Sequence, residues 1–336
     1  MKHFLDVTAE ASVKEYLGTL SDHSLVIYSP TSIEHIDAAR HKGTFMSTHA
    51  IGKDTLQIEA LCTKQRINTV VGLGGGTAID IAKYIASFAG CEFICIPTIL
   101  STNAFATDKV ALIKTGAKVT LDAKLADKII LDTTLVTTAG AHNLYGLCDI
   151  LSIHTALYDW YLADRAGVEK IDRKIYKMSH DLLNGAVSLA LKLTHPSNLD
   201  IPSLFAMIGE SGHITNLYGS GRPESGSEHI FANELERRAD IPHGISIAIG
   251  ITLMSHLQDN GSADIRAALR QIGIMADIAD EYDLRETVVS SLESLRPRKN
   301  RYTILDKKLP TAKISNSLTD ALYTEILGAT NEYSHY

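Results

Sequence analysis

The chain carries a histidine just inside a predicted helix start. The segment from Gly219 to His229 reads Gly-Ser-Gly-Arg-Pro-Glu-Ser-Gly-Ser-Glu-His. Within it, Ser225 and Glu228 have the spacing of a capping box, in which two side chains satisfy the first free N–H groups of a helix. We therefore expect a helix that begins near Gly226 and holds His229 in its first turn.

A second histidine follows in a similar setting. In the run Pro242-His243-Gly244, Pro242 suits the first position of a helix, which puts His243 in the first turn. Two imidazoles at two helix starts can converge on one point. With one carboxylate they make a three-ligand site with an open fourth position, as in catalytic zinc sites. Taken one at a time, either histidine also fits an ordinary capping or surface role.

An aspartate upstream can supply the carboxylate. Asp149 lies among Leu147, Ile150 and Leu151 in a helix-like segment. A carboxylate buried among apolar residues needs a cation or hydrogen-bond donors. The same pattern fits an aspartate on the exposed face of an amphipathic helix, so the residues alone leave both interpretations open.

A glycine-rich turn lies in the first half of the chain. The stretch 68–83 predicts a short buried strand with Val70 and Val71, a turn of glycines at 74–76, and a helix. Such glycines let a ligand approach the backbone, and the N–H groups at the helix start favour a phosphate. The spacing is not the dinucleotide fingerprint Gly-x-Gly-x-x-Gly, because Thr77 stands in the place of the last glycine. Alone, the turn is equally consistent with a structural role.

The order of these motifs resembles that of a known superfamily. The glycine triplet continues as Thr-x-x-Asp-x-x-Lys, and then follow Pro97-Thr98-x-x-Ser101, Gly-x-x-Asp149, the turn ending in His229, and His243-Gly. This order is similar to that of glycerol dehydrogenases, iron-type alcohol dehydrogenases and dehydroquinate synthases. Three details most resemble the sn-glycerol-1-phosphate dehydrogenases: Arg-Pro-x-Ser-Gly-Ser-Glu-His at 222–229, Asp-Trp at 159–160, and Arg-Tyr-Thr-Ile-Leu at 301–305.

The resemblance implies a role for each motif. The metal ligands would be Asp149, His229 and His243. The cofactor would lie against the glycine turn and the segment after the next strand, at Gly74, Gly75, Gly76, Thr77, Asp80, Thr98, Ser101 and Thr102. By their positions beside these motifs, Asn103, Lys109 and Arg222 are candidates to meet the substrate. Cations suit a substrate phosphate, although Lys109 and Arg222 fit equally well as solvated surface charges.

The implied activity is hydride transfer between a nicotinamide cofactor and a small alcohol. A divalent metal, with zinc as first choice and nickel or iron as alternatives, would polarise the substrate oxygen, and NAD or NADP would exchange the hydride. The leading expectation is the interconversion of dihydroxyacetone phosphate and sn-glycerol-1-phosphate, or of a close phospho-polyol. The alternatives are a dehydrogenase of glycerol or another small alcohol, and a carbocycle-forming lyase of the dehydroquinate synthase type. The lyase is disfavoured because those enzymes resemble a chain with Gly-Gly-Lys-Thr-Gly where residues 106–111 read Ala-Thr-Asp-Lys-Val-Ala.

The choice between the two nicotinamide cofactors depends on an early strand. The segment Ile27–Thr31 has no Asp or Glu to bind the ribose hydroxyls of NAD. An acid there would repel the 2′-phosphate of NADP, and no arginine stands beside it to attract that phosphate. We therefore expect both cofactors to be usable.

Composition excludes several other classes. The formal net charge is −7, and the absence of a basic block argues against a nucleic-acid partner. The longest nearly unbroken apolar run, Ile245–Met254, is too short to span a bilayer, and Met1–Val7 lacks the apolar core of a signal peptide. The four cysteines form no Cys-x-x-Cys pair. We expect a cytoplasmic protein without membrane insertion that acts on a small phosphorylated substrate and, by the resemblance, forms a homodimer or larger homo-oligomer.

Two kinds of segment divide the chain. Before about residue 138, strand-like runs alternate with helices, at 25–28, 70–71, 93–96, 110–113 and 128–131. This rhythm predicts a parallel sheet covered on both faces. Helical periodicity dominates afterwards, at 141–164, 171–193, 201–217, 226–238, 243–257 and 262–273. We expect an α/β Rossmann-like nucleotide-binding domain at 1–138 and an all-helical metal- and substrate-binding domain at 139–336, which is the dehydroquinate synthase-like fold.

Overall fold

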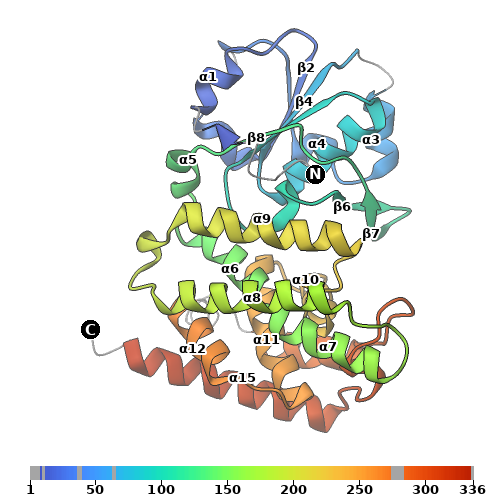
Figure 1. The fold of residues 1–336 in the computed structure, drawn as a ribbon, viewed down its shortest axis with the longest axis vertical. Coiled ribbons are helices and arrows are strands. Elements are labelled where there is room, and N and C mark those ends of the chain that lie inside the picture. The colour runs from blue at the N-terminus through green and yellow to red at the C-terminus, as the bar shows by residue number, and fades with distance from the viewer. Residues whose placement is uncertain (1–7, 10–11, 36–39, 63–65, 274–283, 334–336) are drawn as a thin grey trace. The chain divides into compact units, whose positions relative to one another are not determined.

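The computed structural model describes residues 8–9, 12–35, 40–62, 66–273 and 284–333 (Figure 1). The chain divides into two compact units. The first comprises Met1–Asn143 with Asp200–Asn216, and the second comprises Leu144–Leu199 with Leu217–Tyr336. A single boundary near residue 138 does not describe these units, because the later segment Asp200–Asn216 belongs to the first unit. The assignment of separate functions to 1–138 and 139–336 stays a prediction.

The first unit is built on a parallel sheet. Its described strands are β1 (Thr8–Ala9), β2 (Ser24–Tyr28), β3 (Thr44–Ser47), β4 (Thr69–Gly74), β5 (Glu92–Pro97) and β8 (Lys128–Ile130). They lie in the order β1-β8-β5-β4-β2-β3, and every neighbouring pair is parallel. The predicted parallel sheet is confirmed. The sheet order places β4 and β5 side by side, so the segments that follow them begin at the same edge of the sheet.

Helices cover both faces of this sheet. They are α1 (Val13–Leu17), α2 (Thr48–Ile51), α3 (Thr55–Cys62), α4 (Gly76–Ala89) and α5 (Thr133–Thr137). Residues Val71 and Leu73 of β4 pack in one buried cluster with Leu17 of α1. Side chains alternate along a strand, so Gly72 faces the other side. A β-carbon on Gly72 would lie 3.0 Å from the Ala82 β-carbon, which shows that α4 packs directly against β4.

One predicted strand belongs to a different sheet. Residues 110–113 lie in β6 (Lys109–Lys114), which forms an antiparallel hairpin with β7 (Ala117–Asp122) instead of joining the parallel sheet. Only Thr115 and Gly116 connect the strands, and their φ angles are 51° and 78°. A two-residue turn with two positive φ angles matches an antiparallel pair, whereas parallel strands need a long crossover. The strand predicted at 110–113 is present, but its expected place in the parallel sheet was wrong.

Hydrogen bonds attach the later segment to the first unit. Most of α9 (Ile201–Tyr218) falls in Asp200–Asn216. Its Asn216 amide donates to the Ala106 carbonyl at 3.0 Å and accepts the Asp108 N–H at 2.9 Å. A β-carbon on Gly212 would lie 2.6 Å from that of Ala106, so glycine permits this close approach. The turn between β5 and β6 thus rests on α9.

The second unit is helical in the part that the structure describes. Its helices are α6 (Leu144–Leu151), α7 (Ile153–Arg165), α8 (Arg173–Leu191), α10 (Ser227–Glu236), α11 (His243–Gln258), α12 (Ala263–Ile272), α14 (Arg285–Ser294) and α15 (Ala312–Tyr333). The predicted long helix at 141–164 is divided into α6 and α7 at Ser152. The apolar run 245–254 is a buried helix, as predicted. Among the described residues, no helix combines the length and apolar character that a bilayer crossing requires.

Candidate functional site

The start of α10 places His229 but differs from the predicted cap. Gly226 is the N-cap residue, and no side chain caps the helix in the capping-box manner, so the role predicted for Ser225 was wrong. The Glu228 carboxylate instead accepts the Gly226 N–H at 2.6 Å. A β-carbon on Gly226 would lie 2.5 Å from Asp159 Oδ2, so the close packing here excludes a serine-type cap. His229 lies in the first turn, as predicted.

The start of α11 places His243. Pro242 is the N-cap, one position before its predicted place, and His243 is the first helical residue. A β-carbon on Gly244 would overlap the Tyr145 side chain of α6. Glycine therefore lets the start of α11 lie directly against α6, the helix that carries Asp149.

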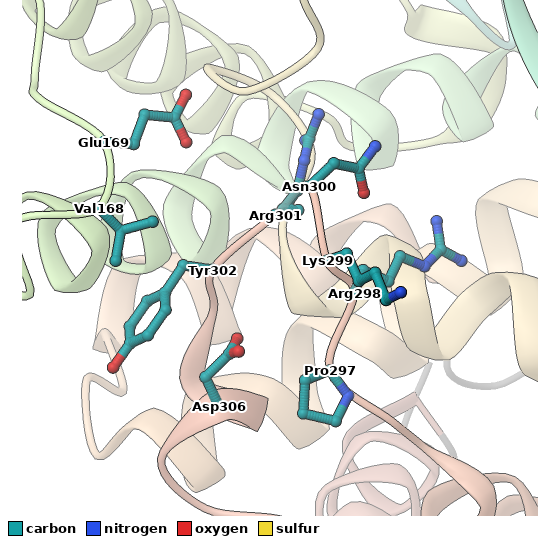
Figure 2. Close-up of a pocket in the computed structure, with 9 residues that line it drawn as sticks. All are labelled: Val168, Glu169, Pro297, Arg298, Lys299, Asn300, Arg301, Tyr302 and Asp306. Atoms are coloured by element: carbon teal, nitrogen blue, oxygen red, sulfur yellow. The ribbon is translucent and has the colours of Figure 1, made fainter.

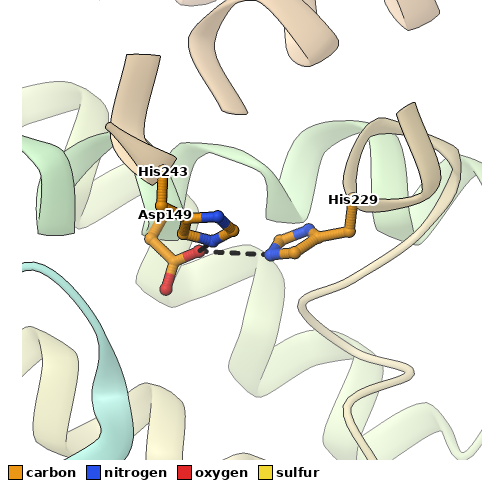
Figure 3. A group of neighbouring side chains, drawn as sticks. All are labelled: Asp149, His229 and His243. Atoms are coloured by element: carbon orange, nitrogen blue, oxygen red, sulfur yellow. Dashed lines mark ion pairs between the residues drawn. The ribbon is translucent and has the colours of Figure 1, made fainter. Parts of the chain in front are cut away.

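Three donor atoms converge between these helices (Figure 3). The Nε2 atom of His229 lies 3.2 Å from Asp149 Oδ1, and the Nε2 atom of His243 lies 3.8 Å from the same oxygen. The ligand atoms of these residues all lie within 4.8 Å of one another. Two imidazoles and one carboxylate suit a divalent transition metal and leave coordination positions for a substrate and water. The donor set therefore fits the metal that the sequence predicts.

The charges of Asp149, His229 and His243 strongly shift one another's pKa values. Burial acts to raise the pKa of Asp149, but the hydrogen bonds of both histidines outweigh burial and hold that pKa well below its usual range. Burial acts to lower the pKa of His229, yet hydrogen bonds with Asp149 and Glu228 raise it to about 10. The pKa of His243 is raised in the same way by Asp149 and Glu236. The carboxylates of Asp149, Glu228 and Glu236 thus favour positive charge at this site. A metal cation can supply that charge in place of the protons on the two histidines.

A tight glycine turn lies at the end of β4 in the first unit. Gly74 has a φ of 149°, and a β-carbon there would overlap the Ser29 hydroxyl. Gly75 is the N-cap of α4, and its N–H donates to Ser29 Oγ at 3.3 Å. A β-carbon on Gly76 would lie 2.9 Å from Thr102 Oγ1. No side chain caps the fourteen-residue α4, so its first N–H groups can receive an anion.

Comparisons with known proteins agree with this geometry. A family model described as iron-containing alcohol dehydrogenase matches residues 30–140. The chain is 31% identical over 261 residues to the glycerol-1-phosphate dehydrogenase (NAD(P)+) of Aeropyrum pernix, with 76% of this chain and 74% of that protein covered. The chain belongs to the glycerol-1-phosphate dehydrogenase family. The enzyme of the same name from Methanothermobacter thermautotrophicus is 30% identical over 269 residues, covering 78% of this chain and 76% of the relative.

Solved structures support the fold of this family member. A probable glycerol dehydrogenase from Sinorhizobium meliloti 1021 superposes with a TM-score of 0.64 at 21% identity, covering 94% of this chain and 93% of that one. Glycerol dehydrogenase from Schizosaccharomyces pombe gives 0.65 at 16% identity, covering 95% and 88%. The predicted fold, a parallel-sheet domain followed by a helical region, is confirmed.

Three hydroxyl residues predicted to border the cofactor lie after β5. Thr98 Oγ1 is 3.1 Å from Ser32 Oγ, and its N–H donates to the Gly74 carbonyl at 3.1 Å. Thr102 Oγ1 accepts the Ala104 N–H at 3.4 Å, and Ser101 is half-buried. The segment therefore joins the glycine turn directly. Thr77, in the first turn of α4, is also half-buried.

Asp80 makes contacts of a different kind. Its carboxylate accepts the Ala111 N–H at 3.0 Å, and burial raises its pKa to about 6 against the opposing charge of Lys83. The Lys83 ammonium is itself buried and donates to the carbonyls of Ala104, Thr107 and Lys109 at 2.6, 2.7 and 2.9 Å. These contacts hold the backbone of residues 104–111 in place. A direct cofactor contact of Asp80 stays a prediction that its burial disfavours.

The residues predicted to meet substrate belong to two different units. Asn103 donates from its amide to Ser211 Oγ at 3.2 Å in the first unit. Lys109 Nζ lies 2.7 Å from Asp122 and 3.0 Å from Asp108, so its charge already has partners. Arg222 belongs to the second unit and is 1% exposed. Its burial disfavours a substrate contact, and the roles of all three stay predictions.

Arg222 and Arg301 hold the turn that leads into α10. Arg222 Nη2 donates to the carbonyls of Asp159 at 3.1 Å and Tyr302 at 2.9 Å, and its Nε lies 3.2 Å from Glu169. Arg301 Nη1 donates to the carbonyls of Gly221, at 3.1 Å, and Ser225. These carbonyls lie just before the helix that carries His229. The resemblance included Arg301 but assigned it no role.

A hollow of about 510 Å³ is lined by Arg301 and Glu169, which contact this turn (Figure 2). Its walls come from 168–169, 297–302 and Asp306. Its lining carries both signs of charge, from Arg298 and Lys299 and from Glu169 and Asp306. None of the predicted site residues lines it. The hollow is therefore distinct from the Asp149, His229 and His243 cluster.

Proposed function

We propose that this chain interconverts dihydroxyacetone phosphate and sn-glycerol-1-phosphate with NAD(P)H and a divalent metal. The observation that carries the proposal is the convergence of Asp149, His229 and His243 in a chain that belongs to the glycerol-1-phosphate dehydrogenase family. The names of these relatives include NAD(P), which supports the nicotinamide cofactor. Zinc is our first choice of metal, with nickel or iron as alternatives, because this donor set suits each of them.

The three residues of the second unit would hold the metal. Asp149 supplies negative charge, and the Nε2 atoms of His229 and His243 point toward its carboxylate (Figure 3). When bound, the metal polarises the substrate oxygen while the nicotinamide exchanges a hydride with the adjacent carbon. The protein's own contribution would be orientation, because Asp149, His229 and His243 come from three different helices and would hold the metal at one point.

The glycine turn of the first unit would bind the cofactor pyrophosphate. Gly76 begins α4 and no side chain caps the helix, so the backbone N–H groups of its first turn and the helix dipole favour an anion there. The strand end at Tyr28-Ser29-Pro30 presents no carboxylate, which supports the use of NADP as well as NAD. Oligomerisation as a homodimer or larger assembly is proposed from family resemblance alone.

The test is a substrate comparison with purified protein that has been loaded with one metal at a time. We expect oxidation of NADH or NADPH with dihydroxyacetone phosphate and much slower oxidation with unphosphorylated dihydroxyacetone. In the reverse direction, sn-glycerol-1-phosphate should reduce NAD(P)+ and sn-glycerol-3-phosphate should not. Equal rates with both ketones would favour a dehydrogenase of unphosphorylated small alcohols. No turnover with either ketone at any metal would refute the proposed activity.

A further inference from the structure

Both metal-site histidines have a carboxylate on the ring nitrogen that faces away from the site. His229 Nδ1 lies 2.9 Å from Glu228 Oε1, and His243 Nδ1 lies 2.5 Å from Glu236 Oε1. In each ring, Nε2 is directed at Asp149. The same arrangement therefore occurs twice, from two residues that sit at opposite ends of α10.

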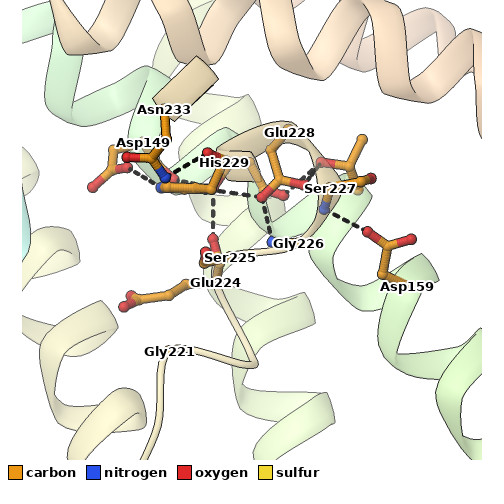
Figure 4. Close-up of polar contacts among 12 residues, drawn as sticks. Asp149, Asp159, Gly221, Glu224, Ser225, Gly226, Ser227, Glu228, His229 and Asn233 are labelled. Atoms are coloured by element: carbon orange, nitrogen blue, oxygen red, sulfur yellow. Dashed lines mark hydrogen bonds and ion pairs between the residues drawn. The ribbon is translucent and has the colours of Figure 1, made fainter. Parts of the chain in front are cut away.

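Glu228 is fixed by contacts on both of its oxygens (Figure 4). Oε1 accepts the Gly226 N–H at 2.6 Å as well as facing His229, and Oε2 accepts the Thr155 hydroxyl at 2.7 Å. Its side chain is fully buried, with 0% exposure. A β-carbon on Gly250 would lie 2.8 Å from the Glu228 carbonyl, so α11 also packs closely against this residue. The carboxylate cannot turn away without breaking the start of α10.

Glu236 is more exposed than Glu228. It is the last residue of α10, and its side chain is 23% exposed. Its carboxylate nevertheless reaches the first residue of α11, His243, across the short connection between the two helices. Water can therefore solvate part of the charge on Glu236, which is not so for Glu228.

A carboxylate on one ring nitrogen determines what the other nitrogen can do. It accepts the Nδ1–H of a neutral imidazole, which leaves the lone pair on Nε2 and makes that nitrogen a better donor to a metal. It also fixes the plane of the ring, so less rotational freedom is lost when the metal binds. Both effects raise metal affinity without any contact to the metal.

We propose that Glu228 and Glu236 are positioning residues that hold His229 and His243 as Nε2 metal ligands, with Glu228 the more important of the two. The inference rests on the proposed metal site and adds the residues that orient it. Glu228 also links the site to the packing of α7 through Thr155, so the geometry of His229 is set by the helix framework. Loss of either carboxylate charge should weaken metal binding by about 10- to 100-fold. The loss should be larger at Glu228, because its side chain is fully buried and water does not screen its charge.

The experiment compares Glu228→Gln and Glu236→Gln with the wild type by competition for Zn²⁺ against a chromophoric chelator, with no substrate present. Glutamine keeps the shape and one acceptor oxygen: in Glu228→Gln that oxygen can still face Gly226 and His229 while the amide donates to Thr155. The matched control is Glu234→Gln on the same helix, because Glu234 pairs with Arg237, Arg238 and Ser294 and not with a ligand histidine. Its zinc affinity should equal that of the wild type.

A second measurement keeps the test independent of folding. In ¹⁵N-imidazole NMR spectra of the zinc-loaded protein, His229 and His243 should be protonated at Nδ1 and bound through Nε2. Zinc-loaded rings bound through Nδ1, or wild-type affinity in both glutamine variants, would overturn the inference while leaving the metal site intact. If Glu228→Gln fails to fold, Glu236→Gln decides, since Glu236 is partly exposed and lies at the end of its helix. A wild type that binds no zinc, nickel or iron would overturn both the site and the inference.

Discussion

Replacing Arg222 by methionine tests whether this residue meets substrate or holds the fold. The sequence leaves a phosphate contact and a solvated surface charge both open, whereas the structure buries the guanidinium in the turn before α10. Methionine keeps the length of the side chain and its apolar stem but removes every donor. If Arg222 is structural, the variant should lose stability, and its Michaelis constant for the phosphorylated substrate should stay near that of the wild type in the folded fraction.

The size of the loss follows from the contacts. The buried carbonyl of Asp159 and the partly buried carbonyl of Tyr302 would lose their charged donor, and an orphaned buried carbonyl costs about 1–3 kcal/mol. Glu169 would lose its ion-pair partner but keeps the Tyr218 hydroxyl at 2.7 Å, and its side chain is 30% exposed. Removing a buried charge offsets part of this cost, because the Nη1 atom of Arg222 is buried without a partner. The net loss should be about 2–4 kcal/mol, or roughly 3–6 °C in Tm for a chain of 336 residues.

The assay is thermal unfolding by calorimetry of the metal-free protein, paired with steady-state kinetics well below the transition. Lys109→Met is the matched control. Because the ion pairs of Lys109 are partly exposed, this substitution should destabilise the protein by no more than about 1 kcal/mol, with a correspondingly small change in Tm. An Arg222→Met protein with unchanged Tm but a sharply raised Michaelis constant for dihydroxyacetone phosphate alone would refute the structural assignment and restore the phosphate contact.

Three further predictions concern the metal, the cofactor and pH. His229→Ala and His243→Ala should each lose most bound metal, and Asp149→Asn should keep its fold yet lose activity; a variant that retains full metal content by elemental analysis contradicts that residue's assignment. Gly75→Val should weaken NAD(P)H binding by about 10- to 150-fold in fluorescence titration, since losing one charge-assisted hydrogen bond costs about 1.5–3 kcal/mol, while metal content stays unchanged; unaltered binding would mean that the turn is only structural. Burial, with the nearby Glu228 charge, raises the pKa of Asp159 from 3.8 to about 7, so the folded chain binds a proton that the unfolded chain has lost. The free energy of unfolding of the wild type, relative to that of Asp159→Asn, should therefore fall as the pH rises from about 4 to about 7 and level off above. If chemical unfolding gives the same difference between the two proteins at every pH, the raised pKa is contradicted.

Local pattern was enough to determine much of the fold. The β-branched runs of β2, β4 and β5 and the glycine turn were read from neighbouring residues, because strand and helix periodicity and glycine turns are local properties. The two histidines were placed in first turns for the same reason, although Ser225 did not cap its helix. Asp149 needed the family resemblance, since a helical aspartate looks alike whether it faces solvent or a cation.

Contacts between distant residues decided the rest. Glu236 has no sequence signal for its role, because it approaches His243 only after α10 and α11 pack together. Glu228 was visible in the sequence but was assigned to a cap, although its carboxylate also reaches Thr155 and His229. Arg222 has the same local pattern whether it is solvated or buried, and only its bonds to two distant carbonyls distinguish the two. The sequence by itself determined which elements form and which residue types could bind a metal; tertiary packing decided which charges are exposed and which are already paired, because burial is a property of the whole unit.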